Sequence, residues 1–321
     1  YTGNATGRSI TGVGFQPDFV WNKTRSATQN HFLFDSIRGT ETALRSNATA
    51  AEGSVDAVTS FDSGGFGVGS GNDGNESGVT YVNWCWKAGG ASSTNSDGSI
   101  SAAVSANINA GFSIVSYTGS GANATVGHGL SSAPEVLITK ARANGSSHWL
   151  TYHSGLGNNT HYMALNTTAA VDTGGASVWN STSPTSSVFS IGTSTWINPS
   201  SGTMIAYCFH SVAGYSKMGS YTGNADVDGA FVHTGFKPGF VMVKSTGSEN
   251  WAITDTARSP YNNANLLLRA DEDTVDTAGA MIMDFLANGF KFRNTDTKSN
   301  GAVSYLFMAF AEMPFKYARG H

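Results

Sequence analysis

Three lysines are the only charged residues found at the same place in every copy of a repeated motif of this sequence. Lys23, Lys140 and Lys244 each follow a run made of a turn, a proline and several bulky apolar residues. Such a set could provide three equivalent cationic sites for an acidic sugar. Alternatively, each lysine packs its methylene stem on aromatic residues and keeps its ammonium group in water, near Asp35 or Asp255. We favour this structural interpretation.

Three aromatic residues are the other candidates for binding. Trp179, Trp196 and Tyr261 lie in loop-like segments and have no aromatic counterparts in the other copies of the motif. Exposed aromatic rings stack on sugars or anchor protein interfaces. The alternative is that these rings fill the seams between copies, and the sequence leaves both interpretations open.

No residue pattern indicates catalysis or a metal site. The sequence has no G-x-S-x-G, no H-E-x-x-H and no papain-like cysteine context. Glycoside hydrolysis requires two carboxylates at a set distance, and no spacing of acidic residues singles out such a pair. His31, His148 and His153 lack the i, i+4 helical spacing of a zinc site. We therefore predict a protein that is not an enzyme and that holds no cofactor and no metal ion.

One glycine-rich run, from Gly69 to Gly74, matches the G-x-G-x-x-G pattern of nucleotide-binding loops. No helix is expected after it, so we interpret it as a hairpin loop. Its oxygen-bearing side chains could hold calcium. The corresponding loops of the other copies do not keep the carboxylates, which argues against a calcium site.

The composition narrows the class of protein. Only 12% of the 321 residues are charged and the formal net charge is −4, which argues against nucleic-acid binding. No apolar stretch is long enough to insert into a membrane as a helix. Cys85 and Cys208 are too few for a disulfide framework and are expected to be free, buried thiols. Abundant Gly, Ser, Thr and Asn with 11% aromatic residues suit a β-rich extracellular or virion protein.

The element that must position the lysines is a strand opened by proline, which recurs about every hundred residues. Proline lacks an N–H and fits the first residue of a strand. The copies predict repeat 1 at residues 1–88, a Gly/Ser-rich linker plus lead-in strand at 89–116, repeat 2 at 117–214, and repeat 3 with a C-terminal tail at 215–321. Lead-in strands are expected before Tyr117 and Tyr221 but not before Tyr1, so we expect further residues upstream of Tyr1.

The closing strand of each copy has one bulky face and one face that ends in a small residue. The bulky face predicts a core contact: Val82, Trp84 and Trp86; Ile205, Tyr207 and Phe209; Leu306, Met308 and Phe310. The opening strand is apolar on both faces and should be covered on both. The predicted fold is therefore all-β, with three tandem repeats of β-sandwich-like antiparallel sheets, five to seven strands each, about a pseudo-threefold axis. A helical turn within residues 41–52 and a flexible link at 89–98 are also expected.

Several runs together resemble one family. They are YTGN…GFQPDFVWNKTRS…FDSIRG, YVNWCWKAGG, VGHGL…AP…WNSTSPTSSVFSIG…YCF and GYSKMGSYTGN…MAFAEMPFKYA. They are similar to an uncharacterised repeat domain of predicted structural or tail-fibre proteins of tailed bacteriophages, often marine ones. The resemblance covers nearly the whole chain. It implies a location on the virion surface and a structural or adhesive role, and it brings no catalytic or binding residues.

The leading hypothesis is a non-enzymatic virion protein: a tail fibre, appendage or decoration component that binds the host surface. Expected partners are further copies of itself in a cyclic homo-oligomer, with the trimer as the candidate form, other virion proteins and a host-surface glycan. Two alternatives are a lectin-like carbohydrate-binding module outside a virion and, less favoured, a polysaccharide depolymerase.

Overall fold

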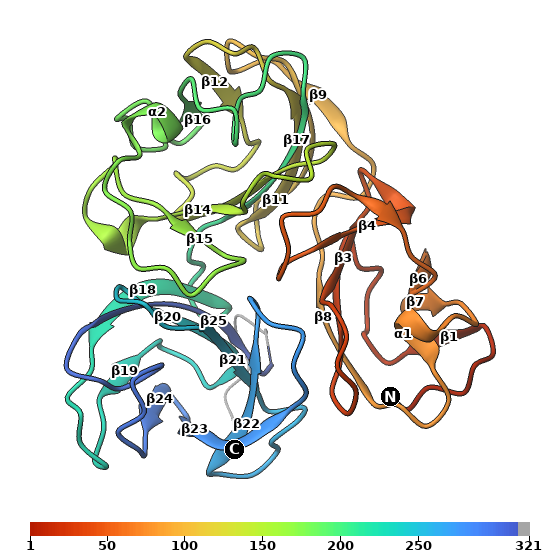
Figure 1. Cartoon of the computed structure of the whole chain (residues 1–321), viewed down its shortest axis with the longest axis vertical. Coiled ribbons are helices and arrows are strands. Elements are labelled where there is room, and N and C mark those ends of the chain that lie inside the picture. Colours follow the sequence, from red (N-terminus) through yellow and green to blue (C-terminus); the bar gives the residue numbers. More distant parts are fainter. Residues whose placement is uncertain (314–321) are drawn as a thin grey trace.

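The computed structural model describes residues 1–313 and is an all-β protein built from antiparallel sheets, as predicted. Figure 1 shows three lobes around a common centre: a first lobe (residues 1–88), a second lobe (89–214) and a third lobe (215–313). Helical structure is limited to the short α1 (Asn72–Asn75), η1 (Ser154–Leu156) and α2 (Ala176–Trp179). In the described part of the chain, no helix is both long and apolar enough to span a membrane.

The first lobe contains a five-stranded and a three-stranded sheet. Its strands are β1 (Arg8–Thr11), β2 (Phe19–Thr24), β3 (Phe32–Asp35), β4 (Gly39–Arg45), β5 (Gly53–Ser54), β6 (Val58–Asp62), β7 (Gly65–Val68) and β8 (Tyr81–Trp86). The larger sheet has the order β5-β4-β3-β2-β8 and the smaller one β1-β7-β6. The opening strand β2 lies between β3 and the closing strand β8, and all of its residues are buried.

The second lobe contains a seven-stranded sheet and a pair of strands. Its strands are β9 (Ser93–Asn95), β10 (Ala102–Asn107), β11 (Phe112–Thr118), β12 (Ala124–Gly127), β13 (Val136–Ala141), β14 (Leu150–His153), β15 (Met163–Ala164), β16 (Val188–Ile191) and β17 (Thr203–Phe209). The large sheet has the order β15-β14-β13-β17-β11-β10-β9, and β12 pairs with β16. Here the opening strand β13 lies between β14 and the closing strand β17, and the predicted lead-in strand β11 covers the other edge of β17.

The third lobe is one eight-stranded sheet that curves into a nearly closed barrel. Its strands are β18 (Ser216–Thr222), β19 (Phe231–His233), β20 (Pro238–Ser245), β21 (Trp251–Asp255), β22 (Ala264–Arg269), β23 (Thr277–Leu286), β24 (Gly289–Phe292) and β25 (Ser304–Ala311). The order is β18-β25-β20-β21-β22-β23-β24-β19. The opening strand β20 begins at Pro238 and lies between β21 and the closing strand β25, whose other edge is covered by the lead-in strand β18.

One hydrophobic cluster joins all three lobes, and each lobe has a further cluster of its own. The shared central cluster contains every residue that was predicted for the bulky faces of the closing strands, and the prediction is therefore confirmed. Its aromatic rings meet across the lobes: Phe209 lies 6.3 Å from Trp86 and 5.9 Å from Phe310 between ring centroids. On the opposite faces of the sheets, Cys208 and Ala309 belong to the clusters of single lobes.

Three local predictions are wrong. The expected helical turn within residues 41–52 is absent: the segment begins with the end of strand β4, where Ala43 and Leu44 pack into the sheet core, and continues as turn and loop. The expected flexible link at 89–98 contains β9, which pairs with β10 at the edge of the second lobe's sheet. The first and third lobes also have more strands than the five to seven expected for each repeat, because turns hold short paired segments such as β5, whereas residues 117–214 agree with the expected number.

Three buried asparagines hold the loops before the closing strands. Asn75, Asn198 and Asn300 have no exposed surface, and each side-chain amide donates to two backbone carbonyls and accepts a backbone N–H. The first of them lies in the loop that was considered for calcium. Its side chain satisfies backbone groups there, as buried polar groups require.

The shared cluster predicts how a core mutation spreads. Phe209→Ala removes a ring that contacts the other two lobes, whereas Phe189→Ala removes an equally buried ring from the second lobe's own cluster. Each change should cost about 3–5 kcal/mol of unfolding free energy. Hydrogen exchange should then accelerate in β8 and β25 for Phe209→Ala but mainly in the second lobe for Phe189→Ala. Acceleration confined to the second lobe in both variants would contradict a shared core.

Candidate functional site

The three repeated lysines are fully buried, and their ammonium groups bind backbone carbonyls. The expectation that these groups stay in water is wrong, because a turn folds its carbonyls back over the end of each opening strand. Lys23 Nζ donates to the carbonyl oxygens of Gln29 (2.9 Å) and Asp273 (3.0 Å). Lys140 Nζ donates to those of Ser147 (2.8 Å), Thr49 (2.9 Å) and Asn144 (3.3 Å). Lys244 Nζ donates to those of Gly247 (2.9 Å), Ser245 (3.0 Å) and Thr168 (3.5 Å).

One carbonyl in each set comes from a different lobe. Lys23 of the first lobe reaches the third, Lys140 of the second reaches the first, and Lys244 of the third reaches the second. The contacts therefore form a closed ring in which each lobe donates to one neighbour and accepts from the other. We call the boundaries the first–second, second–third and third–first seams.

Burial lowers the pKa of all three lysines to about 8. Loss of water penalises the charged form, and the carbonyl dipoles offset only part of that cost. Hydrogen bonds to an ammonium group are nevertheless among the stronger ones in proteins. Because the Nζ atoms are enclosed, the lysines join lobes and present no cationic surface to a sugar.

A second polar contact crosses the first–second seam. Asp35 accepts from Arg38 Nε at 2.6 Å and from the hydroxyl of Tyr207 at 2.8 Å. Arg38 also donates to the carbonyl of Leu33 at 2.7 Å. Both charged side chains are wholly buried, so the pair depends on its full set of hydrogen bonds.

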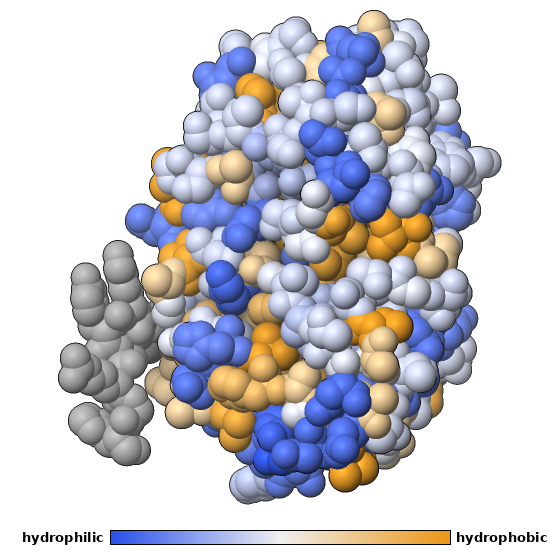
Figure 2. All heavy atoms as spheres, turned by 90° about the vertical axis from the view of Figure 1, so that its left-hand side faces the viewer, coloured by the Kyte–Doolittle hydropathy of each residue, from blue (hydrophilic) through white to orange (hydrophobic). Residues whose placement is uncertain are grey.

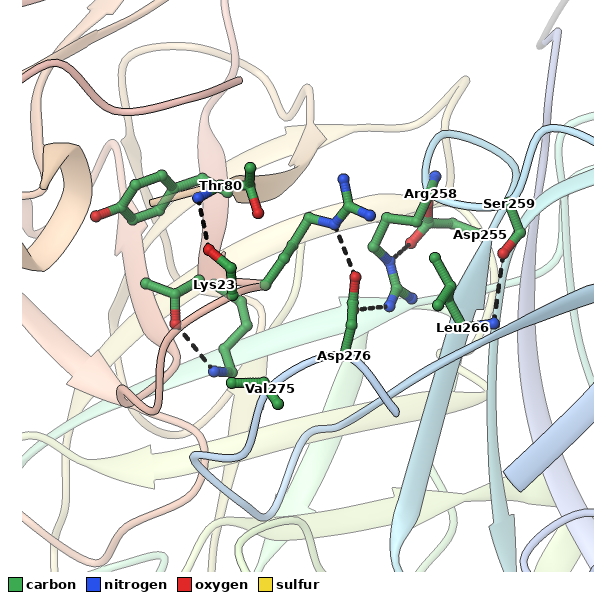
Figure 3. A network of polar contacts seen from close by, with 12 residues as sticks. Lys23, Thr80, Asp255, Arg258, Ser259, Leu266, Val275 and Asp276 are labelled. Atoms are coloured by element: carbon green, nitrogen blue, oxygen red, sulfur yellow. Dashed lines mark hydrogen bonds and ion pairs between the residues drawn. The ribbon is translucent and has the colours of Figure 1, made fainter. Parts of the chain in front are cut away.

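The same arrangement recurs at the third–first seam. Asp255 accepts from Arg258 Nε at 2.6 Å and from the indole N–H of Trp84 at 3.1 Å. Figure 3 shows Asp276 next to Arg258 with Lys23 of the first lobe close by, and Asp276 also pairs with Arg25 at 2.8 Å. The carboxylate of Asp276 thus links the third lobe, through Arg258, directly to the first lobe, through Arg25.

The second–third seam lacks these ions. His153 stands in the place of the two aspartates, and its Nε2 lies 3.2 Å from the carbonyl oxygen of Phe307. Burial lowers the pKa of His153 to about 4, so the ring is neutral at pH 7. Met308 occupies the closing-strand position of Tyr207 and Trp84, where no side-chain donor is needed.

The three aromatic candidates lie in different environments. Trp179, in α2, is 1% exposed and packs in the second lobe's own cluster, so it neither meets solvent nor fills a seam. Trp196 is half-buried, with its ring 5.1 Å from that of His148. Tyr261 is 83% exposed and borders a small hollow of about 170 Å³. Only Tyr261 can stack on a ligand with most of its ring.

Both cysteines are free thiols, as predicted, but only Cys208 is fully buried, whereas Cys85 is half-buried. Burial raises the pKa of both thiols to about 12, which keeps them protonated and unreactive at neutral pH. His31 is enclosed and accepts from the indole of Trp21 at 2.8 Å. Within residues 1–313 no group of His, Cys, Asp and Glu side chains is arranged to hold a metal ion.

A cleft of about 530 Å³ opens at the third–first seam. One wall is formed by Val82 to Trp86 of β8 and by Lys87, and the other by the ends of β20, β21 and β25. Asn107 and Ala110 of the second lobe also border the cleft. Two carboxylates border it: Asp255, which pairs with Arg258, and Glu312, which pairs with Lys237 at 2.7 Å. Each is matched to a cation on its own side, so the cleft lacks the opposed free acids that glycoside hydrolysis requires.

The face of the molecule seen in Figure 2 is mainly polar. The face of the second and third lobes in Figure 2 is hydrophilic for the most part, and its hydrophobic residues form small separate patches. Small isolated patches are ordinary on soluble proteins.

The chain was compared with known families, curated proteins and solved structures. Residues 1–314 match the model of a family described as a domain of unknown function, DUF7483. The chain belongs to this family. No curated protein and no solved structure matches it significantly.

Sequence reasoning found the repeated lysines but missed their partners, and it missed the Asp-x-x-Arg pairs. The signal for the pairs was present, because Asp35 and Arg38 have the same spacing as Asp255 and Arg258. The lysine partners are backbone carbonyls, which leave no residue-type signal. The DUF7483 match adds no binding residue to those found from the structure.

The buried lysines predict a pH dependence of stability. Lys140 loses its proton near pH 8 in the folded state, whereas an unfolded lysine holds it to about pH 10.4. Between these values the unfolded state binds more protons, so the free energy of unfolding should rise with pH, by up to about 1.4 kcal/mol per pH unit from this residue. Lys140→Met should remove that part of the rise.

Urea unfolding at about pH 8 and about pH 9.5 measures the difference while most tyrosines are still protonated. Lys87→Met, at an exposed lysine, is the matched control and should keep the rise of the unmodified protein. Equal pH slopes for the unmodified protein and Lys140→Met would show that the ammonium group is not desolvated.

Proposed function

We propose that the protein is a non-enzymatic structural component of a virion: a tail fibre, appendage or decoration protein exposed on the particle. The ring of lysine–carbonyl contacts carries this proposal, because the only charges repeated in all three lobes are used to hold the lobes together. The paired carboxylates of the cleft and the high pKa of both thiols support a structural role over a catalytic one. The sequence resemblance to phage structural proteins supplies the virion location.

We further propose that the lobes are three copies of one module about a pseudo-threefold axis, with the boundaries 1–88, 117–214 and 215–321. The equivalent hydrogen bonds of Asn75, Asn198 and Asn300 support this proposal. So does the shared order of opening, closing and second strands in the three large sheets. Residues 314–321 of the third copy lie outside the described part.

The proposed partners are further copies of the chain, other virion proteins and a host-surface glycan. A cyclic homo-oligomer, with the trimer as the candidate form, is common for such appendages. The polar outer surface in Figure 2 suits contact with hydrated glycans.

A particle assay tests the virion role. Purified particles of a tailed phage that encodes this chain should contain its peptides at a fixed ratio to the capsid protein, and antibody labelling should place them on the outer surface. Peptides that wash away with host proteins on density-gradient purification would contradict the proposal. Native mass spectrometry of the isolated chain gives the oligomeric state.

A second candidate function is glycan binding outside a virion, and one observation favours it. The exposed ring of Tyr261 borders a hollow that Lys237, Asn262 and Ser259 help to line. An aromatic face with amide, hydroxyl and ammonium groups beside it matches the apolar face and hydroxyl groups of a sugar.

Tyr261→Ala tests this site on a glycan array. Loss of the stacked ring should weaken binding by about tenfold or more, since such contacts are worth about 1–3 kcal/mol. Val227→Ala, at another exposed apolar residue, should leave binding unchanged. Equal binding by Tyr261→Ala would remove this candidate site, and release of reducing ends from host polysaccharide would instead indicate a depolymerase.

A further inference from the structure

The closing strand of the first lobe has an open edge. Among residues 1–313, β8 pairs with the opening strand β2 but with no strand on its other side. In the second and third lobes that other side is covered by β11 and β18. An open edge presents unpaired backbone N–H and C=O groups, which is the requirement for adding a strand.

Residues of β8 are more exposed than their counterparts in the closing strands that are covered on both edges. Asn83 and Cys85 are half-buried, whereas their counterparts under a lead-in strand, Ala206 and Cys208, are fully buried. Along β8 the backbone N–H and C=O groups of successive residues point to alternate sides of the strand. The carbonyl of Trp86 accepts from the N–H of Asp18, on the side of β2. The N–H and C=O groups of Asn83 and Cys85 therefore point away from β2, toward the open side.

The chain already begins the missing pairing. Tyr1 and Tyr81 exchange two backbone hydrogen bonds, 3.2 Å from Tyr1 N to Tyr81 O and 2.8 Å from Tyr81 N to Tyr1 O. Thr2 forms an antiparallel bridge with Thr80. Tyr117 with Met204 and Tyr221 with Tyr305 are paired in the corresponding places of the other sheets. Any polypeptide joined to Tyr1 is thus aimed along the edge, and its first residue would lie opposite Val82.

The space beside the edge is the 530 Å³ cleft at the third–first seam. At the second–third seam the equivalent position holds β18, which packs against η1 and places Met218 in the central cluster. In the second lobe, β11 places Phe112 and Ile114 in that cluster. Within residues 1–313, no residue of a lead-in strand reaches the cluster from the first lobe. The cleft therefore has the position and lining of a site for one more strand.

We propose that the edge of β8 from Val82 to Trp86, together with the cleft, is a site that accepts a five-residue β-strand whenever polypeptide is joined directly to Tyr1. Covalent continuity fixes the register and raises the local concentration far above that of a free peptide. The strand pairs its backbone with Asn83 and Cys85. The site favours an apolar residue at the third position before Tyr1, in the place of Ile114 and Met218, where it would fill the cleft beside Trp84 and Phe240. This strand site does not depend on a virion role.

Extension of the chain tests the proposal. Phe-Ser-Ile-Val-Ser, the sequence of residues 112–116, is added before Tyr1. Amide hydrogen exchange at Asn83 and Cys85 should slow by about tenfold or more relative to the unextended chain, and the melting temperature should rise. Gly-Ser-Gly-Ser-Gly is the matched control of equal length, and Phe-Ser-Pro-Val-Ser tests strand geometry, because proline lacks an N–H. Neither should protect these amides.

Three results would overturn the proposal. The first is protection of Asn83 and Cys85 in the unextended chain, which would show that the edge is already covered. The second is equal protection by the Gly-Ser or proline extension. The third is equal protection by free Phe-Ser-Ile-Val-Ser peptide at the same molar concentration as the protein, which would assign the site to a separate partner.

Discussion

The structure depends on the burial of three ammonium groups at the boundaries between lobes. An isolated charge in a protein interior costs several kcal/mol unless polar groups replace its water. Each lysine finds those groups only when two lobes are in place, because its own turn supplies part of the carbonyl set and the neighbouring lobe supplies the rest. Docking of the lobes and solvation of the charge are therefore one event. A lobe displaced by a few ångströms would leave an ammonium group in an apolar boundary with an incomplete set of acceptors.

Around this ring the boundaries differ in chemistry. Two of them add a buried Asp–Arg pair that receives a hydrogen bond from the next lobe, through Tyr207 in one case and Trp84 in the other. The third replaces the pair with neutral His153 and an apolar Met308. Removal of both members of a buried ion pair avoids an unsatisfied charge. The differences between copies are thus matched across each boundary, which is what a close-packed interior demands.

The sequence was most informative where side-chain size and alternation decide the structure. The bulky faces of the closing strands, the doubly covered opening strands and the free thiols follow from period-two patterning and residue size. Contacts made by backbone atoms were beyond its reach: Lys23 meets the carbonyl of a residue 250 positions away, and no residue type marks a carbonyl. Trp179 was misjudged because its polar flanking residues suggested a loop, whereas the one-turn helix α2 turns the indole inward. Local composition predicts exposure poorly when a short element reorients a single ring.

In the closed ring, the contacts that hold the lobes together are independent of the peptide links that join the lobes in sequence. Each lobe is held by both neighbours through buried charges and a common aromatic centre. The covalent links between lobes therefore contribute little to holding the lobes in place. After protease cleavage near Gly89 and Gly90, the two fragments should remain associated through these contacts. The order of the lobes along the chain could likewise be changed by circular permutation without changing the folded structure. Such a fold is expected to keep its shape after a single backbone cleavage between lobes.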